Sequence, residues 1–198
     1  MNIPINLSHF HPHLELAHRY WKELLQPGDH AIDATCGNGK DTLKLAQLLH
    51  STSQLITLDI QSLALQRTQQ FLREHLPIEQ LSRIHFFQQS HVEFPSLAYT
   101  FPIKLIVYNL GYLPGGEKSI TTQTMTTLMS LSAAQSLIAR GGMISITCYP
   151  GHDEGKMEQE ALLNTVKALN SNEWQVLFHN WPNRPCSPNL LLLSKSYN

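Results

Sequence analysis

Two stretches of this 198-residue chain have residue types and spacing suited to chemistry on an amino group. The first, LIVYNLGYLPGGEKS at 105–119, is an apolar run that ends on Asn109 and continues into Leu110, Gly111 and Tyr112. At the carboxyl end of a strand, an amide, a close backbone turn and an aromatic ring can hold a planar nitrogen base. The Asn109 amide oxygen and the Leu110 carbonyl would accept the N–H bonds of an amine, and Tyr112 would stack on the base.

The second stretch, AIDATCGNGKDT at 31–42, places two glycines between a short apolar run and a helical pattern. Gly37 and Gly39 permit positive φ and a close approach of the backbone to a ligand. The start of the helix behind them offers free N–H groups. The third glycine of the dinucleotide fingerprint is absent, which argues against NAD. A tight strand-to-helix turn without a ligand is the plainer alternative.

An acidic residue at the end of the next apolar run supports a nucleoside ligand. Asp59 ends LITLD, 26 positions after Asp33, and an acidic side chain there can accept both ribose hydroxyls. A surface Asp that only caps the following helix would look the same in isolation, but two such motifs at this separation rarely arise by accident. Together with the amine-orienting stretch, they indicate a methyltransferase that uses S-adenosylmethionine. This reaction requires neither a metal ion nor a covalent enzyme intermediate.

The elements that must position these residues alternate between strand and helix patterns, which is typical of a parallel α/β sheet. Strands are expected at 30–34, 54–58, 84–87, 103–108, 143–148, 174–178 and 190–193. Helices are expected at 14–25, 41–50, 62–75, 121–139 and 153–169. The pattern predicts one α/β domain over 1–198: a doubly wound, mostly parallel seven-stranded sheet with an N-terminal helix, closed by a strand pair. Ligands of such sheets bind beyond the carboxyl ends of the strands, where the loops named above converge.

Three further features of this edge have a functional and a plainer interpretation. The loop after the fifth strand, YPGHDE at 149–154, points to the ligand edge, and Asp153 is also a plausible helix N-cap. The loop at 180–188 contains three prolines, so Trp181 and Arg184 either contact a nucleotide or belong to a rigid hairpin connection. Cys36 has no second cysteine nearby in sequence, which favours a packing role over a metal ligand.

Composition excludes some classes and leaves others open. A hydrophobic content of 42% argues against a disordered chain, and no apolar run approaches the ~20 residues that span a bilayer. The first residues lack the pattern of a secretory signal, and three widely spaced cysteines fit a reducing, cytoplasmic location. A net charge of −1 neither indicates nor excludes a nucleic-acid partner. The assembly state is open, and a homodimer is among the states allowed.

Four motifs, DATCGNGKDT, LDIQ, YNLGYLPGGEKSITT and YPGHDEGKMEQE, resemble the YtqB-like rRNA methylase family. That family is now associated with MnmM-type tRNA 5-aminomethyl-2-thiouridine methyltransferases. The resemblance runs over about 16–195, nearly the whole chain. It implies a class I methyltransferase fold, S-adenosylmethionine, and a wobble-uridine aminomethyl group in the anticodon region of tRNA as acceptor.

The motifs and the resemblance together define the candidate site. The expected cofactor-binding residues are Asp33, Thr35, Gly37, Asn38, Gly39, Asp41, Thr42, Asp59, Gln61, Ser90, His91 and Asn109. The expected catalytic residues are Asn109, Tyr112, Tyr149 and His152, with Tyr149 or His152 as proton acceptor. The expected substrate-binding residues are Leu110, Gly111, Tyr112, Trp181 and Arg184. His91 has a structural alternative.

Two other functions are compatible with the same residues. The stretch Asn109–Tyr112 resembles the Asn-Pro-Pro-Tyr arrangement of adenine amino-methyltransferases, so methylation of an exocyclic base amine in rRNA or DNA is one alternative. A non-catalytic module that binds S-adenosylmethionine is the other. The intact Asn-x-Gly-Tyr stretch disfavours the module, because a pure binder has no need of an acceptor site.

Overall fold

Seven strands and their connecting helices are described by a computed structural model, which covers residues 12–113, 115 and 121–197. The strands are β1 (His30–Asp33), β2 (Leu55–Asp59), β3 (Ile84–Gln88), β4 (Ile103–Asn109), β5 (Met143–Cys148), β6 (Trp174–His179) and β7 (Asn189–Lys195). The helices are α1 (His13–Leu24), α2 (Lys40–Leu48), α3 (Ser62–His75), α4 (Ile78–Leu81), the 3₁₀ helix η1 (Ser96–Thr100), α5 (Thr124–Leu137) and α6 (Asp153–Lys167).

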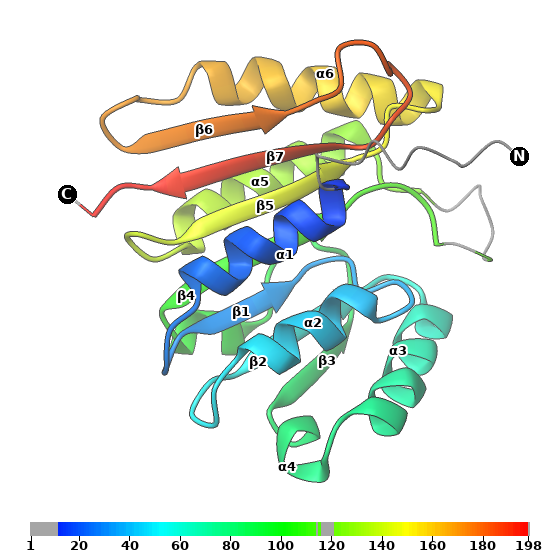
Figure 1. The fold of residues 1–198 in the computed structure, drawn as a ribbon, viewed down its shortest axis with the longest axis vertical. Coiled ribbons are helices and arrows are strands. Elements are labelled where there is room, and N and C mark those ends of the chain that lie inside the picture. Colours follow the sequence, from blue (N-terminus) through cyan, green and yellow to red (C-terminus); the bar gives the residue numbers. More distant parts are fainter. Residues whose placement is uncertain (1–11, 114, 116–120, 198) are drawn as a thin grey trace, which may run out of the picture.

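The strands form one sheet in the order β3-β2-β1-β4-β5-β7-β6 (Figure 1). The first five pair in parallel, whereas β7 runs antiparallel to both β5 and β6. From β1, the chain adds β2 and β3 on one side of the sheet and then returns to add β4 and the later strands on the other side of β1. This confirms the expected mostly parallel, doubly wound sheet and places the topological switch point beside the carboxyl ends of β1 and β4.

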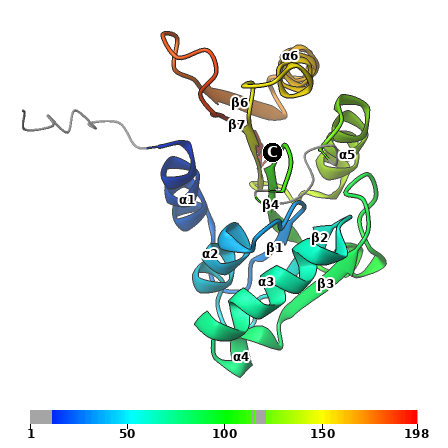
Figure 2. The same cartoon turned by 90° about the vertical axis from the view of Figure 1, so that its right-hand side faces the viewer.

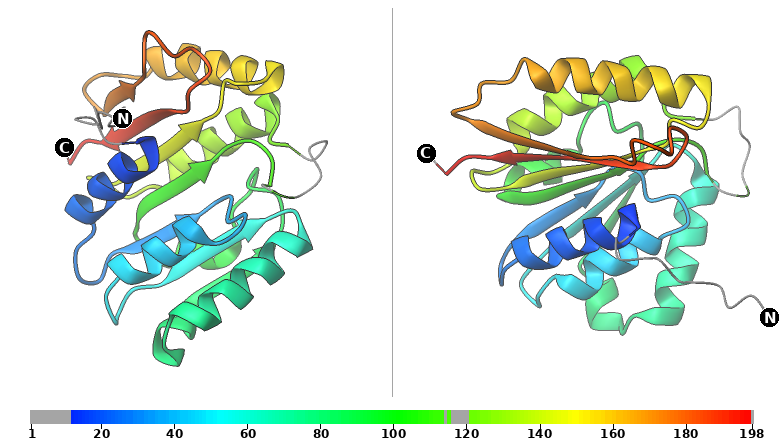
Figure 3. Two further views of the ribbon diagram at one scale, coloured as in Figure 1. Left: turned by 45° about the vertical axis from the view of Figure 1, so that its right-hand side comes forward. Right: turned by 45° about the horizontal axis from the view of Figure 1, so that its top comes forward.

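The sheet is covered on both faces, which explains why its central strands are apolar at successive positions. Leu105 and Val107 of β4 pack with α1, α2 and α3, while Ile106 and Tyr108 pack with α5 and α6. Figures 2 and 3 show the two groups of helices on opposite faces. The sheet is therefore the middle layer of three, and the loops at the carboxyl ends of its strands are where a ligand can bind.

Three details differ from the sequence expectation, and part of one motif is not described. The helices α4 and η1 are too short to give a clear periodic pattern. Helix α5 begins at Thr124 rather than at 121, because Thr121 forms an isolated antiparallel bridge with Tyr112. Residues 114 and 116–120 of the motif at 105–119 lie outside the described residues. The N-cap of α6 is His152 rather than Asp153, since His152 Nδ1 accepts a hydrogen bond from the Gly155 amide.

Membrane spans and metal clusters are both absent from the described part of the chain. None of its helices is both long enough and apolar enough to cross a membrane. Within the same residues, no three His, Cys, Asp or Glu side chains are grouped so that they could hold a metal ion.

Candidate active site

The loop after β1 is organised around a buried carboxylate. Asp33, the last residue of β1, accepts hydrogen bonds from the Thr35 amide at 3.2 Å and from Thr42 Oγ1 at 2.6 Å. Burial raises the pKa of Asp33 to about 7, and the hydrogen bond from Thr42 opposes this rise. Thr42 itself is fully buried. Thr42 is one of the expected cofactor-binding residues, and in the structure its hydroxyl donates a hydrogen bond to Asp33.

The glycines of this loop adopt the conformations expected of them. Gly37 and Gly39 have φ of 53° and 81°. A Cβ on Gly39 would lie 3.0 Å from two side-chain atoms of Thr68 in α3, so the position has no room for a side chain. Thr68 Oγ1 also donates to the Gly37 carbonyl at 3.1 Å. Helix α3 therefore fixes the path of the loop that precedes α2.

Asp59, at the end of β2, connects the first two loops. Its Oδ2 accepts from the Gly37 amide at 3.1 Å, and its Oδ1 accepts from the Gln61 amide at 2.9 Å. Burial raises the pKa of this carboxyl. Because each carboxylate oxygen has a second lone pair, Asp59 keeps the capacity to accept two ribose hydroxyls. These two acceptor oxygens fit the ribose hydroxyls of S-adenosylmethionine.

Other expected cofactor residues lie around these loops in different environments. Asn38 Oδ1 accepts from Arg67 at 3.5 Å, and the exposed Ser90 accepts from the Val92 amide at 3.3 Å. His91 is buried edge-on against Tyr108, with ring centroids 5.8 Å apart, and burial lowers its pKa to about 4. Its packing matches the structural alternative for His91. Cys36 is also a packing residue, since it is buried in a small apolar cluster with Leu65 and Leu113.

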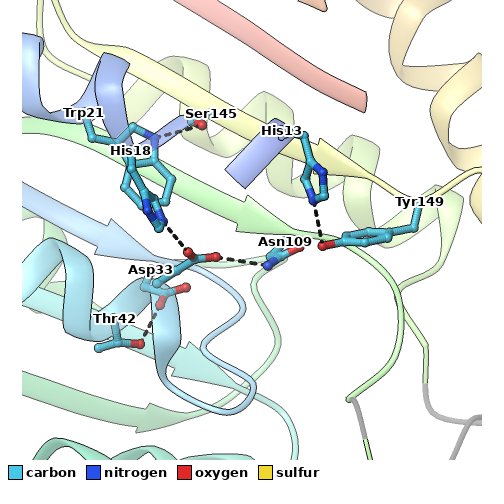
Figure 4. A network of polar contacts seen from close by, with 9 residues as sticks. His13, His18, Trp21, Asp33, Thr42, Asn109, Ser145 and Tyr149 are labelled. Carbon is cyan, nitrogen blue, oxygen red and sulfur yellow. Dashed lines mark hydrogen bonds and ion pairs between the residues drawn. The ribbon is translucent and has the colours of Figure 1, made fainter. Parts of the chain in front are cut away.

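Asn109 lies at the end of β4, directly beside the β1 loop (Figure 4). Its backbone amide donates to Thr35 Oγ1 at 2.7 Å, and its Nδ2 donates to Asp41 Oδ2 at 3.0 Å. The other oxygen of Asp41 lies 2.8 Å from Nε2 of His18, a residue of α1 that the sequence did not single out. Thr35 and Asp41, both expected to bind cofactor, therefore also hold Asn109.

Tyr149, the first residue after β5, lies next to the Asn109 side chain. Its hydroxyl lies 3.4 Å from His13 Nε2, and the side chain also interacts with Asn109. Burial, with the negative charge of Asp41 as a second cause, raises the pKa of Tyr149 to about 12. The ring of His152 lies 6.1 Å from that of Tyr112. His152 Nδ1 is engaged as the N-cap acceptor of the Gly155 amide.

Hydrogen bonds to Thr122, and through it to helix α6, hold the turn after Asn109 in place. The Gly111 amide donates to Thr122 Oγ1 at 2.8 Å, and the Thr122 amide donates back to the Gly111 carbonyl at 3.0 Å. Thr122 Oγ1 in turn donates to Glu158 of α6 at 3.0 Å, and Thr127 donates to the same buried carboxyl. Leu110 is tied to β5 through its amide, which donates to the Thr147 carbonyl at 3.0 Å. Glu158 is thus a second site residue that the sequence did not single out.

The loop between β6 and β7 borders this edge. Strand β7 begins at Asn189, which pairs with Cys148 at the carboxyl end of β5. In this loop the Arg184 guanidinium lies 5.3 Å from the Trp181 ring centroid. The structure therefore brings the loops after β1, β4 and β5 together around Asn109, and Asp59 joins the loop after β2 to the loop after β1.

This arrangement of loops on a doubly wound sheet agrees with comparisons to known proteins. The family described as "Putative rRNA methylase" matches residues 55–195. The chain belongs to this family. A chloroplastic tRNA (mnm(5)s(2)U34)-methyltransferase of Arabidopsis thaliana is 34% identical over 190 residues, which are 93% of this chain and 69% of that protein.

Two solved structures have the same class I methyltransferase fold. A Clostridium thermocellum protein described as a "putative rRNA-methylase" is 32% identical, with a TM-score of 0.86 over 94% of this chain and 98% of that chain. A Streptococcus mutans "putative methyltransferase", solved in complex with SAH, is 28% identical, with a TM-score of 0.79 over 94% and 99% of the two chains.

The buried carboxyl of Asp33 predicts a pH-dependent stability. Its folded pKa of about 7 lies above the ordinary value of 3.8, so the native state holds a proton that the unfolded chain releases between these values. Stability from this group is therefore lost as the pH rises from about 4 to about 7. Asp33→Asn removes this titration. Within this pH window, the free energy of unfolding of Asp33→Asn minus that of the wild type should therefore rise by about 1.4 kcal/mol per pH unit.

Urea unfolding of the cofactor-free protein at about pH 4.5 and about pH 7.5 measures this difference. His91 titrates with the opposite sign, because its lowered pKa costs stability as the pH falls, and it is present in both proteins. It cancels when the two are compared. Parallel pH profiles for wild type and Asp33→Asn would show that Asp33 is ionised throughout this range.

Proposed function

We propose that this S-adenosylmethionine-dependent methyltransferase acts on RNA and methylates the 5-aminomethyl group of wobble 2-thiouridine in tRNA. The Arabidopsis thaliana relative, whose name describes methylation at that nucleoside, supports the proposal across 93% of the chain. The observation that carries it is the Asn109 amide, held at the switch point by Thr35 and Asp41 beside the cofactor loop.

Residues of the first two loops fit the methyl donor. S-adenosylmethionine supplies an electrophilic methyl group on a sulfonium. Asp59 would bind the ribose hydroxyls, and the loop at Gly37 and Gly39 allows the backbone to approach the ligand. Asp33 accepts hydrogen bonds from the Thr35 amide and from Thr42 and so supports this loop from below. These residues would hold the cofactor next to Asn109.

Asn109, Tyr112 and Tyr149 would orient the acceptor. Asn109 Oδ1 accepts an N–H bond of the amine and directs its lone pair toward the methyl carbon. The ring of Tyr112, which is 41% exposed, would stack on the uridine base. Most of the rate enhancement would come from holding nitrogen, carbon and sulfur in line, since orientation alone supplies large effective molarities.

The acceptor amine must lose a proton before it attacks, because an aliphatic aminomethyl group is largely protonated at neutral pH. His152 Nδ1 already accepts from the Gly155 amide, whereas the Tyr149 hydroxyl interacts with Asn109 and would meet the amine there. The Tyr149 hydroxyl, with its pKa raised to about 12, stays protonated near neutral pH but is hydrogen-bonded to His13. Burial lowers the pKa of His13, so its imidazole is neutral near neutral pH and would pass the proton on rather than keep it.

Single-turnover methylation of tRNA that carries the aminomethyl group tests this function. The rate should rise between about pH 6.5 and about 8.5, because deprotonation of an aliphatic amine or its acceptor base limits attack. An exocyclic adenine amine is already neutral at pH 7 and has no such requirement. Nucleoside mass spectrometry of the product identifies the modified base.

An unmodified transcript of the same tRNA is the matched control and should stay unmethylated. Efficient methylation of that transcript or of rRNA at an adenine, with a flat pH profile, would replace the wobble-uridine proposal with the exocyclic-amine alternative. Binding of S-adenosylmethionine without turnover on any RNA would instead favour a non-catalytic module.

A further inference from the structure

The two ends of the Asn109 amide are chemically different, since Nδ2 only donates hydrogen bonds and Oδ1 only accepts them. The atom that faces Asp41 Oδ2 lies 3.0 Å from it. An ionised carboxylate offers acceptors alone, so the Asn109 nitrogen must point toward Asp41. Its oxygen is then directed to the other side.

Asp41 is itself held in place by a residue from another element. It lies in the first turn of α2, is 8% exposed, and its Oδ1 is 2.8 Å from His18 Nε2. The His18 ring packs on Trp21, with centroids 4.7 Å apart, and Trp21 Nε1 donates to Ser145 of β5 at 3.0 Å. Helix α1 is thus anchored on the sheet through Trp21 and Ser145 (Figure 4), and its His18 presents the imidazole to the Asp41 carboxylate.

The backbone of Asn109 is restrained independently of its side chain. Its amide donates to Thr35 Oγ1 at 2.7 Å, and it is the last residue of β4. With the backbone fixed in this way, the remaining freedom of Asn109 is rotation of its side chain. The contact of Nδ2 with Asp41, together with the interaction with Tyr149, removes that freedom.

We propose that His18 and Asp41 are positioning residues that hold the Asn109 amide with Oδ1 toward the acceptor amine. This inference rests on the proposed function, in which Asn109 faces the acceptor. A rotated amide would present N–H groups to the amine and could not accept its hydrogens. The pair therefore favours acceptors that carry an N–H bond.

A double-mutant cycle of Asp41→Ala and Asn109→Ala tests the coupling. The single-turnover rate on aminomethyl-tRNA should fall on the order of 10-fold to 10²-fold in Asp41→Ala, as expected when a reacting group is misplaced. In the Asn109→Ala background, Asp41→Ala should cause no further loss. His18→Ala should lower the rate less, and His18→Gln, which keeps an N–H donor, should restore most of it.

Two measurements exclude a general structural effect. SAH affinity by calorimetry should stay nearly unchanged in His18→Ala and His18→Gln, because His18 contacts Asp41 from α1 and is not among the expected cofactor-binding residues. Ser145→Ala removes the partner of Trp21, so it should lower the melting temperature but not the methylation rate. Additive losses in the double variant, a collapse of SAH affinity, or an equal rate loss in Ser145→Ala would each overturn the positioning role.

Failure of the wild type to methylate aminomethyl-tRNA would overturn the proposed function. A separate measurement then tests whether Asp41 holds the Asn109 amide. The Asn109 Nδ2 proton resonances in an NMR spectrum should shift in Asp41→Ala and be retained in Ser145→Ala. Unshifted resonances in Asp41→Ala would show that Asp41 does not hold the amide.

Discussion

Asn109→Ala should lower the methylation rate on the order of 10²-fold, which is the scale expected when a reacting group loses its orientation. Asn109 is assigned to the acceptor, so the affinity for S-adenosylmethionine should change little. Single-turnover rates and calorimetric titration measure the two quantities separately. Asn109→Asp should be no more active than Asn109→Ala, since a second carboxylate would lie beside Asp41.

Asn164→Ala is the matched control, because Asn164 is an exposed residue of α6. It should keep both the rate and the affinity of the wild type. An Asn109→Ala variant with normal turnover on aminomethyl-tRNA would contradict the acceptor role. A variant that loses the cofactor would instead place Asn109 in the cofactor site.

Asp59→Ala should weaken binding of S-adenosylmethionine, since charge-assisted hydrogen bonds are worth about 1.5–3 kcal/mol each. That corresponds to roughly a 10-fold to 10²-fold rise in Kd for each ribose hydroxyl that loses its partner. The carboxylate also accepts from the Gly37 and Gln61 amides, so the loop contributes to the effect. Calorimetry on the folded variant measures it.

Asp29→Ala provides the comparison for Asp59→Ala. Asp29 also accepts a backbone hydrogen bond, from the Gln26 amide at 2.8 Å, but it precedes β1 and lies at the amino end of the strands. Its variant should bind the cofactor as the wild type does. If Asp59→Ala also binds normally, Asp59 has no part in the cofactor site.

The strands could be predicted from sequence within one or two residues, because each is an apolar run bounded by turn residues. Asp33, Asp59 and Asn109 could be placed at one edge because parallel strands end together. His18 could not, although it lies three residues before the buried Trp21 and so on a related helical face. The periodicity of α1 shows which side is apolar, but it does not show which loop of the sheet the flanking polar residues meet.

The start of α5 and the anchoring of the turn after Asn109 were missed for a similar reason. Thr124 receives its cap from Glu154, whose Oε1 accepts from both the amide and the hydroxyl of Thr124. Glu158 accepts from Thr122 and Thr127. These acidic residues lie about thirty positions away in sequence, and the helical pattern of α6 gives no sign that one side reaches across to α5.

Because β7 lies between β5 and β6 in the sheet, the sheet cannot be completed until the end of the chain has been synthesised. Strand β5 ends at Cys148, but the strand that covers its edge begins only at Asn189. A nascent chain on the ribosome that stops short of residue 189 therefore leaves β5 as an open edge, and β6 has no neighbour in the sheet. Unpaired strand edges recruit other chains. Premature termination anywhere in the forty residues between β5 and β7 should thus yield chains that chaperones retain or that aggregate.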